Sequence, residues 1–208
     1  HRSLRRQRQM CIRDSYSMGL YVLFFGSKKK FSDVAHHTIW MSERYKELLH
    51  DIFEKKILTE DFSLYLHRPT ATDDTFAPEG CDSFYVLCPV PNLQGNVQWN
   101  SEGPKLKDRI VEALDKTIMP GLKENIEAEF WMTPEDFKND YRSKYGAGFS
   151  VAPIFSQSAW FRYHNKDKKI PNLYFSAAGS HPGAGIPGVL CSAKVIEKLI
   201  IKDFKVSH

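Results

Sequence analysis

The chain is poor in the residues that build small metal-bound or disulfide-bonded domains. It has four cysteines in 208 residues, and none of them are in Cys-x-x-Cys spacing. Zinc sites of the finger type and disulfide-stapled miniature folds both need closely spaced cysteines. The adjacent pair His36 and His37 is expected to point to opposite faces of a strand, so the two rings should not share an ion. We therefore expect reduced thiols and no metal site.

Long hydrophobic runs are also missing. A membrane-spanning helix needs about 20 consecutive apolar residues, whereas the longest run, from Met18 to Phe25, has the length of a strand. No apolar core with a small-residue cleavage site follows the basic start, which argues against a secretory signal. A cytoplasmic location is the resulting expectation.

The excess of positive over negative charge is confined to the beginning of the chain. The net charge is +4, but residues 1–30 carry eight lysines and arginines against one acid, so the rest is net negative. Nucleic acid is therefore not an expected partner. Residues 1–15 (HRSLRRQRQMCIRDS) lack apolar periodicity, and we interpret them as a non-native or disordered leader on a fragment of a longer protein. The acids Asp73, Asp74 and Glu79 are expected to form a solvated loop.

The remaining composition is that of a globular protein, with 42% hydrophobic and 13% aromatic residues. Runs with strand character and segments with helical spacing occur together, which predicts a mixed α/β fold. Helices are expected from Ser42 to about Lys56, from about Lys105 to Met119, from Thr133 onward, and over residues 189–201. Strands are expected over residues 16–26, 37–41, 62–67, 83–90, 126–132 and 173–177.

A glycine-rich segment, GSHPGAGIPG over residues 179–188, lies between the last predicted strand and helix. Its four glycines permit positive φ angles and close approach of the backbone to a ligand. The following helix start offers unpaired N–H groups, which favour a phosphate or an electron-rich ring edge. The classical dinucleotide fingerprint, which is GxGxxG after a first strand with an acidic residue about 20 positions further on, is absent. If this segment binds a dinucleotide, the other half of the site is expected outside this chain.

The stretch NLYFSAAGSHPGAGIPGVLCSAK (172–194) resembles the C-terminal flavin-contacting motif of bacterial and fungal phytoene desaturases, which are carotenoid-forming FAD oxidoreductases. The resemblance extends through EDFSLYLHRPTATDDTFAPEGCDSFYVLCPVPNL (60–93), EGPKLKDRI (102–110) and FSVAPIFSQSAWFRYHNKD (149–167). It implies a mixed-sheet substrate domain over residues 16–150 and a return to a Rossmann-like FAD-binding domain over residues 151–208. Ala177 departs from the glycine that the family more often has. The residues that the resemblance places against FAD are Gly179, Ser180, His181, Pro182, Gly183, Gly185, Ile186 and Pro187.

The resemblance also implies the reaction, the FAD-dependent desaturation of a carotenoid precursor such as phytoene, with a hydride passing from the polyene to the flavin. It names no catalytic acid or base, and the chain alone is expected to be inactive without the missing N-terminal half. Expected partners are a lipid-soluble polyene and the membrane surface, where the enzyme would bind peripherally. Arg162 and His164 are candidates for the cofactor site or channel mouth. Candidate channel residues are Phe149, Phe155, Trp160 and Phe161.

Two alternatives remain open. A carotenoid isomerase or a retinoid saturase of the same superfamily would use the same cofactor frame on a related polyene. From a different class, the chain could be a non-catalytic fragment that acts only as a binding module.

Overall fold

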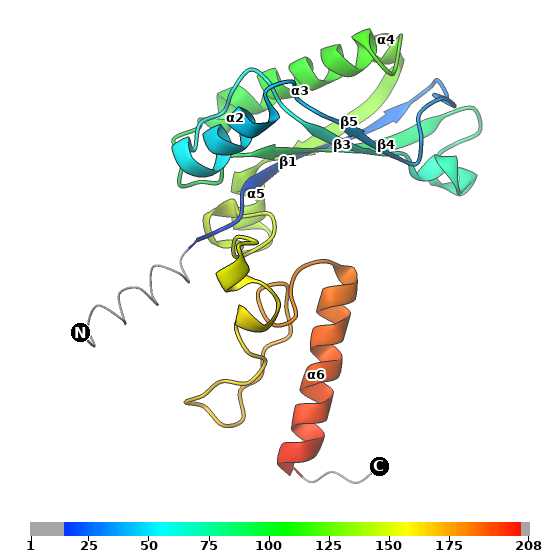
Figure 1. Cartoon of the computed structure of the whole chain (residues 1–208). Coiled ribbons are helices and arrows are strands. Elements are labelled where there is room, and N and C mark those ends of the chain that lie inside the picture. The colour runs from blue at the N-terminus through cyan, green and yellow to red at the C-terminus, as the bar shows by residue number, and fades with distance from the viewer. Residues whose placement is uncertain (1–14, 205–208) are drawn as a thin grey trace. The chain divides into compact units, whose positions relative to one another are not determined.

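The structure is a computed structural model that describes residues 15–204. It forms two compact units, Met18–Gly148 and a second one that combines the segment up to Ser17 with the segment from Phe149 onward. We call them the sheet unit and the turn unit (Figure 1). Helix and strand are both well represented, which confirms the predicted α/β class. Of the predicted leader, only Ser15 lies within the described residues, and the assignment of the units to substrate and cofactor stays a prediction.

The sheet unit is built on a five-stranded sheet with the order β2-β3-β4-β1-β5, in which every pairing is antiparallel. The five predicted strands in this unit are confirmed to within three residues. Their bounds are Gly19–Ser27 (β1), His37–Trp40 (β2), Leu64–His67 (β3), Asp82–Val90 (β4) and Ile126–Met132 (β5).

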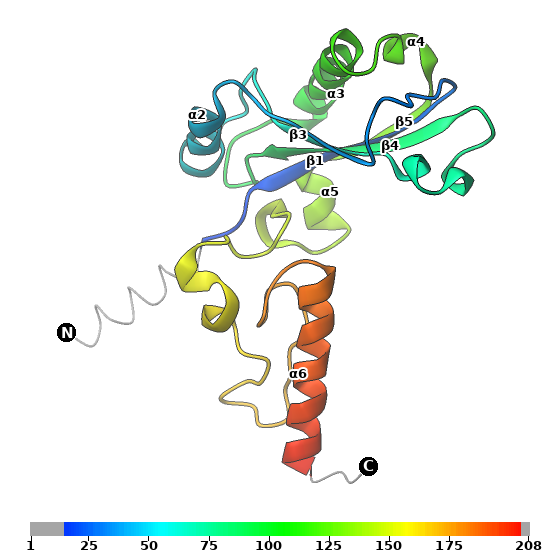
Figure 2. The ribbon, with the colours of Figure 1, turned by 45° about the vertical axis from the view of Figure 1, so that its right-hand side comes forward.

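The sheet presents one face to a core because buried and partly exposed side chains alternate along its strands, as in β4. Helix α3 (Trp99–Lys116) covers this face in both ribbon views (Figures 1 and 2) and buries Leu106, Ile110 and Leu114 there. The Tyr21 hydroxyl on β1 donates to the Gly103 carbonyl of α3 at 2.9 Å. A hydrogen bond and a hydrophobic stripe together hold the helix on the sheet.

Helix α3 begins earlier than the sequence predicts. Pro104 suggested that the helix starts after the proline, but the structure places the proline inside it, five residues after the first helical position, Trp99. The reason is tertiary: Trp99 is buried and its ring stacks on that of Tyr21, with the centroids 6.4 Å apart. This packing fixes the first turn, and the missing N–H of Pro104 costs the helix a single backbone hydrogen bond.

Three short helices complete the unit, namely α2 (Tyr45–His50), α4 (Leu122–Asn125) and α5 (Pro134–Asn139). The predicted start at Thr133 is confirmed, because Thr133 and Asp136 form a capping box. Ser42 is not the cap of α2: Arg44 precedes the helix, and the Ser42 hydroxyl instead donates to Asp61 at 2.8 Å. A π-helical turn, Asp51–Lys55, continues α2 and ends at Lys56.

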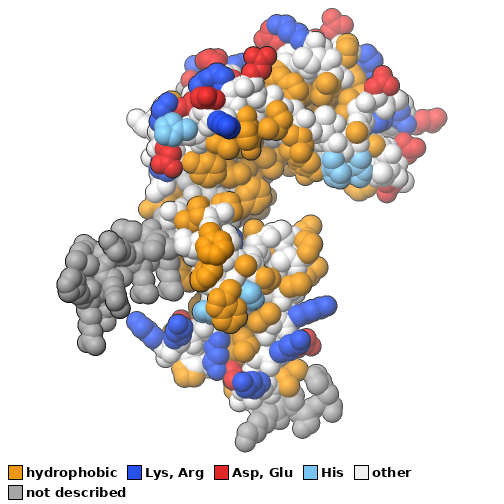
Figure 3. Space-filling view, viewed as in Figure 1, with side chains coloured by type: hydrophobic (Ala, Val, Ile, Leu, Met, Phe, Trp, Pro, Cys, Tyr) orange, Lys and Arg blue, Asp and Glu red, His pale blue; other side chains and the backbone are white. Residues whose placement is uncertain are grey.

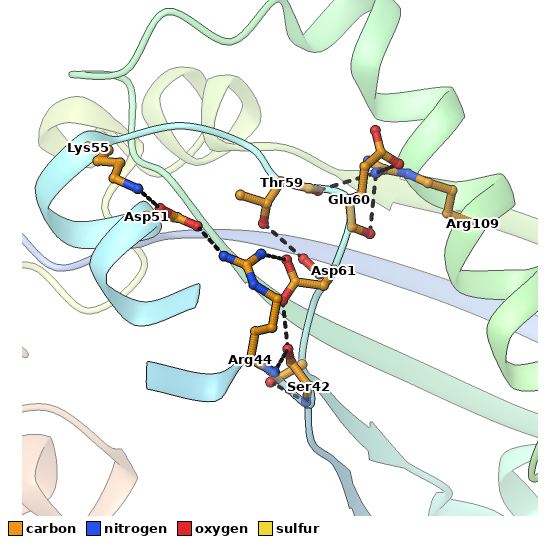
Figure 4. Close-up of polar contacts among 9 residues, drawn as sticks. Ser42, Arg44, Asp51, Lys55, Thr59, Glu60, Asp61 and Arg109 are labelled. Carbon is orange, nitrogen blue, oxygen red and sulfur yellow. Dashed lines mark hydrogen bonds and ion pairs between the residues drawn. The ribbon is translucent and has the colours of Figure 1, made fainter. Parts of the chain in front are cut away.

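A polar network joins α2 to the segment before β3 (Figure 4). Arg44 donates to Asp61 at 3.0 Å and to Asp51 at 3.5 Å, and Lys55 donates to Asp51 at 2.6 Å. The hydrogen bond from Lys55 is the main cause of a lowered pKa for the Asp51 carboxyl. Because the pKa of Asp51 is lower in the folded state, its ion pair stabilises the fold at neutral pH. This stabilisation is lost as the pH falls through the folded-state pKa. Arg109 of α3 closes the network on Glu60 at 2.9 Å.

A second, buried ion pair lies at the start of β4. The Asp82 carboxylate accepts hydrogen bonds from the Arg68 guanidinium at 3.1 Å, from the Thr70 hydroxyl at 2.6 Å and from the Phe31 amide at 2.6 Å. Arg68 in turn donates to the Val34 carbonyl at 3.1 Å. A buried charge is tolerated only when it is paired and hydrogen-bonded, and here both conditions hold. One carboxylate thus joins three separate segments of the chain.

We predict that Asp82→Asn lowers the free energy of unfolding by about 3–5 kcal/mol, because it leaves the Arg68 charge buried without a counter-ion. The measurement is urea denaturation followed by circular dichroism. Asp74→Asn is the matched control, since the Lys30–Asp74 pair is exposed and such pairs contribute about 0–1 kcal/mol. Equal effects of the two substitutions would contradict the prediction.

The turn unit contains helix α6 (Ile186–Phe204) and two short 3₁₀ turns, Phe155–Gln157 and Ala159–Phe161. The predicted strand over residues 173–177 is wrong: this segment forms only one isolated bridge, between Tyr174 and Lys166. A strand needs a neighbouring strand to pair with, and none of the named strands lies in this unit.

Helix α6 begins three residues before the predicted position, because Pro187 fits the first helical turn. On this helix, Leu190 is 62% exposed and Ile200 is exposed as well. The loops of this unit cover only a narrow side of the helix, on which Ser192 is the one residue that is fully buried among those described. None of the described helices is long and apolar enough to span a bilayer.

Candidate functional site: the glycine-rich turn

The side chain of Asn165 holds the glycine-rich turn in place through hydrogen bonds. Its amide donates to the Ser192 hydroxyl at 2.8 Å, to the His181 carbonyl at 2.9 Å and to the Phe175 carbonyl at 3.0 Å. Asn165 and Ser192 are both buried. Buried polar groups are costly unless they are hydrogen-bonded, so this arrangement fixes the segment before the turn, the turn and α6 together.

Ser180 completes this polar centre. Its hydroxyl lies 3.0 Å from that of Ser192 and bonds both backbone groups of Ala177, donating to the carbonyl at 2.9 Å and accepting from the amide at 3.1 Å. The residue is buried. Of the predicted cofactor residues, Ser180 therefore directs its side chain inward, and its amide also donates to the Ala177 carbonyl at 3.1 Å.

Arg162 supports the same turn from the other side. It is buried, and it donates to the carbonyls of Ala178 at 3.1 Å and Gln157 at 3.2 Å. Burial lowers the pKa of its guanidinium. The structure thus uses Arg162 to hold backbone carbonyls, whereas its role at the cofactor or channel mouth stays a prediction.

The path of the turn depends on glycine at three positions. Gly183 and Gly185 have φ angles of 145° and 92°, a region in which L side chains are strained. A Cβ on Gly188 would lie 2.7 Å from the Gly183 carbonyl, so only glycine lets the turn fold back onto the start of α6. Beyond them the chain is open to solvent, with Ile186 80% exposed.

Aromatic residues lie beside this turn. The Trp160 ring meets His181 and His164 edge-on, with centroid distances of 5.7 and 5.2 Å. His181 also places Nδ1 3.0 Å from the Ala159 carbonyl. The structure therefore brings His181, His164 and Trp160 together, as neighbours of the predicted cofactor surface.

The four candidate channel residues are all exposed: Phe155 by 84% and Trp160 by 66%, and Phe161 and Phe149 by less. Phe155 and Phe161 contact each other, with ring centroids 5.4 Å apart. A small hollow of about 10 Å³ lies next to Phe161. Hydrophobic side chains are visible on the surface of this unit in Figure 3. The channel itself stays a prediction.

We predict that Asn165→Ala loosens the turn, because it leaves the buried Ser192 hydroxyl and two carbonyls with fewer partners, at a cost of about 1–3 kcal/mol. Hydrogen exchange should become faster at the amides of Phe175 and His181, which bond the carbonyls of Asn165 and Tyr163. Asn172→Ala, at an exposed position, is the matched control. Unchanged protection at both amides would rule out this anchoring role.

The sheet unit has a second surface that the sequence reasoning missed. On the sheet face opposite α3, the Phe24 ring stacks on Phe130 at 4.5 Å and meets Tyr85 at 5.8 Å, and Tyr85 lies 5.8 Å from Tyr65. These four rings form an aromatic band across β5, β1, β4 and β3. Phe24, Tyr85 and Phe130 line a hollow of about 340 Å³. Burial raises the pKa of Tyr85 to about 12, so its phenol stays protonated.

The signal for this band was weak in the sequence. Phe24 stands between the buried Leu23 and Phe25, so the run has no visible alternation. Only the strand register, which pairs Phe24 with both Tyr85 and Phe130, places the rings side by side.

Three histidines meet at the end of the band. The expectation that His36 and His37 point to opposite faces is wrong: their rings stack with centroids 4.3 Å apart, and the Nε2 atoms of His36 and His67 are 2.8 Å apart. Alternation holds only within a strand, and His36 lies in a bend before β2. Burial, followed by the charges of the two neighbours, lowers the pKa of His67.

The relatives that comparison with known proteins finds are named as desaturases of the same kind. No family model matches the chain. A phytoene desaturase (lycopene-forming) of Pantoea ananas is 50% identical over 188 residues, which are 90% of this chain and 38% of that protein. A phytoene desaturase (neurosporene-forming) of Rhodobacter capsulatus is 47% identical over 190 residues, 89% of this chain and 36% of that protein.

A more distant relative is the 4,4'-diapophytoene desaturase (4,4'-diapolycopene-forming) of a Methylomonas species, which is 33% identical over 92% of this chain and 37% of its own length. The chain thus covers well under half of each of these relatives. The resemblance of the sequence to the phytoene desaturases is therefore confirmed, over nearly all of this chain and a part of such an enzyme.

Proposed function

We propose that this chain is part of an FAD-dependent oxidoreductase that desaturates a carotenoid precursor such as phytoene. The observation that carries the proposal is the identity of 47–50% to proteins named phytoene desaturases, over about nine tenths of the chain. In such a reaction two hydrogens leave an unactivated polyene, one as a hydride and one as a proton. The flavin supplies the hydride acceptor, and the protein supplies orientation and exclusion of water.

The glycine-rich turn fits a flavin cofactor. Its solvent-facing part is the backbone at Gly185 and the start of α6, whose first turn contains no acidic residue. Unpaired N–H groups and the positive end of a helix dipole favour an electron-rich ring edge or a phosphate without any charged side chain. The residues proposed to hold FAD are Gly179, Ser180, His181, Pro182, Gly183, Gly185, Ile186 and Pro187.

The proposed substrate is a hydrocarbon, so its site must be apolar and can offer no hydrogen bond. The aromatic band of the sheet unit supports this, because its rings line a hollow with few polar groups. In the turn unit, the exposed rings of Phe149, Phe155, Trp160 and Phe161 are available for the same contact. We assign no general acid or base for this reaction.

The proposal is tested with a chimera in which this chain replaces the matching segment of the Pantoea ananas phytoene desaturase, produced in cells that accumulate phytoene. We predict that the chimera binds FAD and yields polyenes with longer conjugation. Gly185 has a φ of 92°, so a valine there should be strained by about 1–2 kcal/mol. We expect Gly185→Val to lower flavin retention roughly tenfold. Ala184→Val, at the exposed neighbouring position, is the matched control.

The absorption spectrum of the extracted polyenes and the flavin content of the purified chimera give the result. Longer wavelength bands support desaturation, whereas an unchanged number of double bonds with altered geometry supports an isomerase instead. A chimera that folds without retaining any flavin would contradict the proposed cofactor site. Equal flavin loss in the two variants would show that the turn is sensitive to bulk alone.

We also propose that the enzyme works in the cytoplasm at the membrane surface without spanning it, because the substrate dissolves in lipid. Phe155 and Trp160 are large apolar side chains with little cover in the turn unit. Large aromatic side chains are favoured at the membrane interface.

We predict that the chimera floats with phospholipid vesicles in a density gradient. The double variant Phe155→Ser and Trp160→Ser should weaken this binding, since each buried aromatic contributes about 1.5–3 kcal/mol. Phe76→Ser, a comparably exposed position in the sheet unit, is the control. Flotation that survives the double substitution while desaturation is lost would assign both rings to the substrate and contradict their membrane role.

A further inference from the structure

We propose that His36, His37 and His67 form a binding site for a divalent transition-metal ion such as Zn²⁺. One ring nitrogen from each residue lies within 4.8 Å of the others. The cluster stands at the edge of the sheet, where His37 pairs with His67 across β2 and β3. Histidine side chains are visible on the surface of the sheet unit in Figure 3. This inference does not depend on the proposed desaturation.

Hydrogen bonds orient two of the three rings. The Tyr65 hydroxyl lies 2.7 Å from Nδ1 of His37, and the Thr72 hydroxyl lies 3.1 Å from Nδ1 of His36. Metal-ligating histidines almost always use their second nitrogen for such a bond, which fixes the ring and the tautomer. This leaves Nε2 of His37 for an ion, whereas Nε2 of His36 makes a hydrogen bond with Nε2 of His67 at 2.8 Å, which an ion would replace.

The backbone holds the ligands in place before any ion binds. The Arg68 amide donates to the His36 carbonyl at 2.9 Å, and Arg68 follows His67 directly in the chain. Arg68 is itself fixed by the buried Asp82. Two of the three ligands are thus attached, through Arg68, to the buried Arg68–Asp82 ion pair.

The spacing is close to that of a zinc site. Zn–N bonds of about 2.0–2.1 Å in a tetrahedral site separate the ligand nitrogens by about 3.4 Å. The observed separations, from 2.8 Å between His36 and His67 up to 4.8 Å, bracket this value. Small rotations of the rings would therefore suffice.

The ligand chemistry selects the class of ion. Three neutral imidazoles suit zinc, copper, nickel and iron, whereas magnesium and calcium prefer oxygen ligands. Three histidines leave the fourth tetrahedral position open to water or another small ligand. His37 is exposed, so an ion reaches the site from solvent.

The test is a Zn²⁺ titration of the purified full chain after chelator treatment, with a competing chromophoric indicator and with thermal unfolding as a second measurement. We expect one equivalent of Zn²⁺ to bind and to raise the unfolding temperature, and Mg²⁺ to have no such effect. Co²⁺ provides a spectroscopic probe: the proposed site predicts a tetrahedral spectrum without the thiolate charge-transfer band that a cysteine ligand would add.

Variants identify the ligands. His37→Gln and His67→Gln should each abolish the tight binding of one equivalent of Zn²⁺. Tyr65→Phe removes an orienting hydroxyl but no ligand, so it should weaken Zn²⁺ binding by about 10–100-fold. His50→Gln, at an exposed position of α2, is the matched control. Because His37 is exposed, its variant is expected to keep the circular dichroism spectrum of the parent.

Two results would overturn the proposal. One is the absence of a bound equivalent in the parent chain. The other is equal Zn²⁺ binding by the parent, His37→Gln and His67→Gln, which would place the ion on other residues. A thiolate band in the Co²⁺ spectrum would have the same meaning.

Discussion

The sheet unit depends on one buried carboxylate. Asp82 joins the loop after β1, the end of β3 and the start of β4, because it accepts hydrogen bonds from Phe31, Arg68 and Thr70. Arg68 sits next to His67 in the chain and bonds the backbone of His36. The same contact therefore sets the place of the histidine cluster at one end of the aromatic band. A charge that is expensive to bury gives this region a single arrangement.

The turn unit is organised differently. Among its described residues, few apolar side chains are buried, with Val151 and Ala152 as examples, and the centre is instead polar, formed by Asn165, Ser180 and Ser192. Directional hydrogen bonds specify the path of the backbone well. However, burying these polar groups removes little apolar surface from water. A unit of this kind gains limited free energy from the hydrophobic effect and is expected to open more easily than the sheet unit.

The sequence predicted what depends on local periodicity and capping. The five strands of the sheet and the Thr133 capping box follow from neighbouring residues alone. What failed depends on distant contacts: α3 starts early because Trp99 packs on Tyr21, and the strand expected over residues 173–177 has no neighbouring strand. The partner of Asn165 is Ser192, 27 residues away, and no pattern in the sequence relates them. In the candidate site, the sequence predicted the glycines of the turn, but it did not predict the buried hydrogen bonds that hold the turn in place.

The position of Trp160 has an optical consequence. The chain has four tryptophans, and Trp40, Trp99 and Trp131 all belong to the sheet unit, so Trp160 is the one indole of the segment that carries the glycine-rich turn. Its ring lies against the imidazoles of His164 and His181. Indole emission responds to the polarity and charge of its immediate neighbours. The chain thus carries an intrinsic fluorophore that reports on the surroundings of the turn.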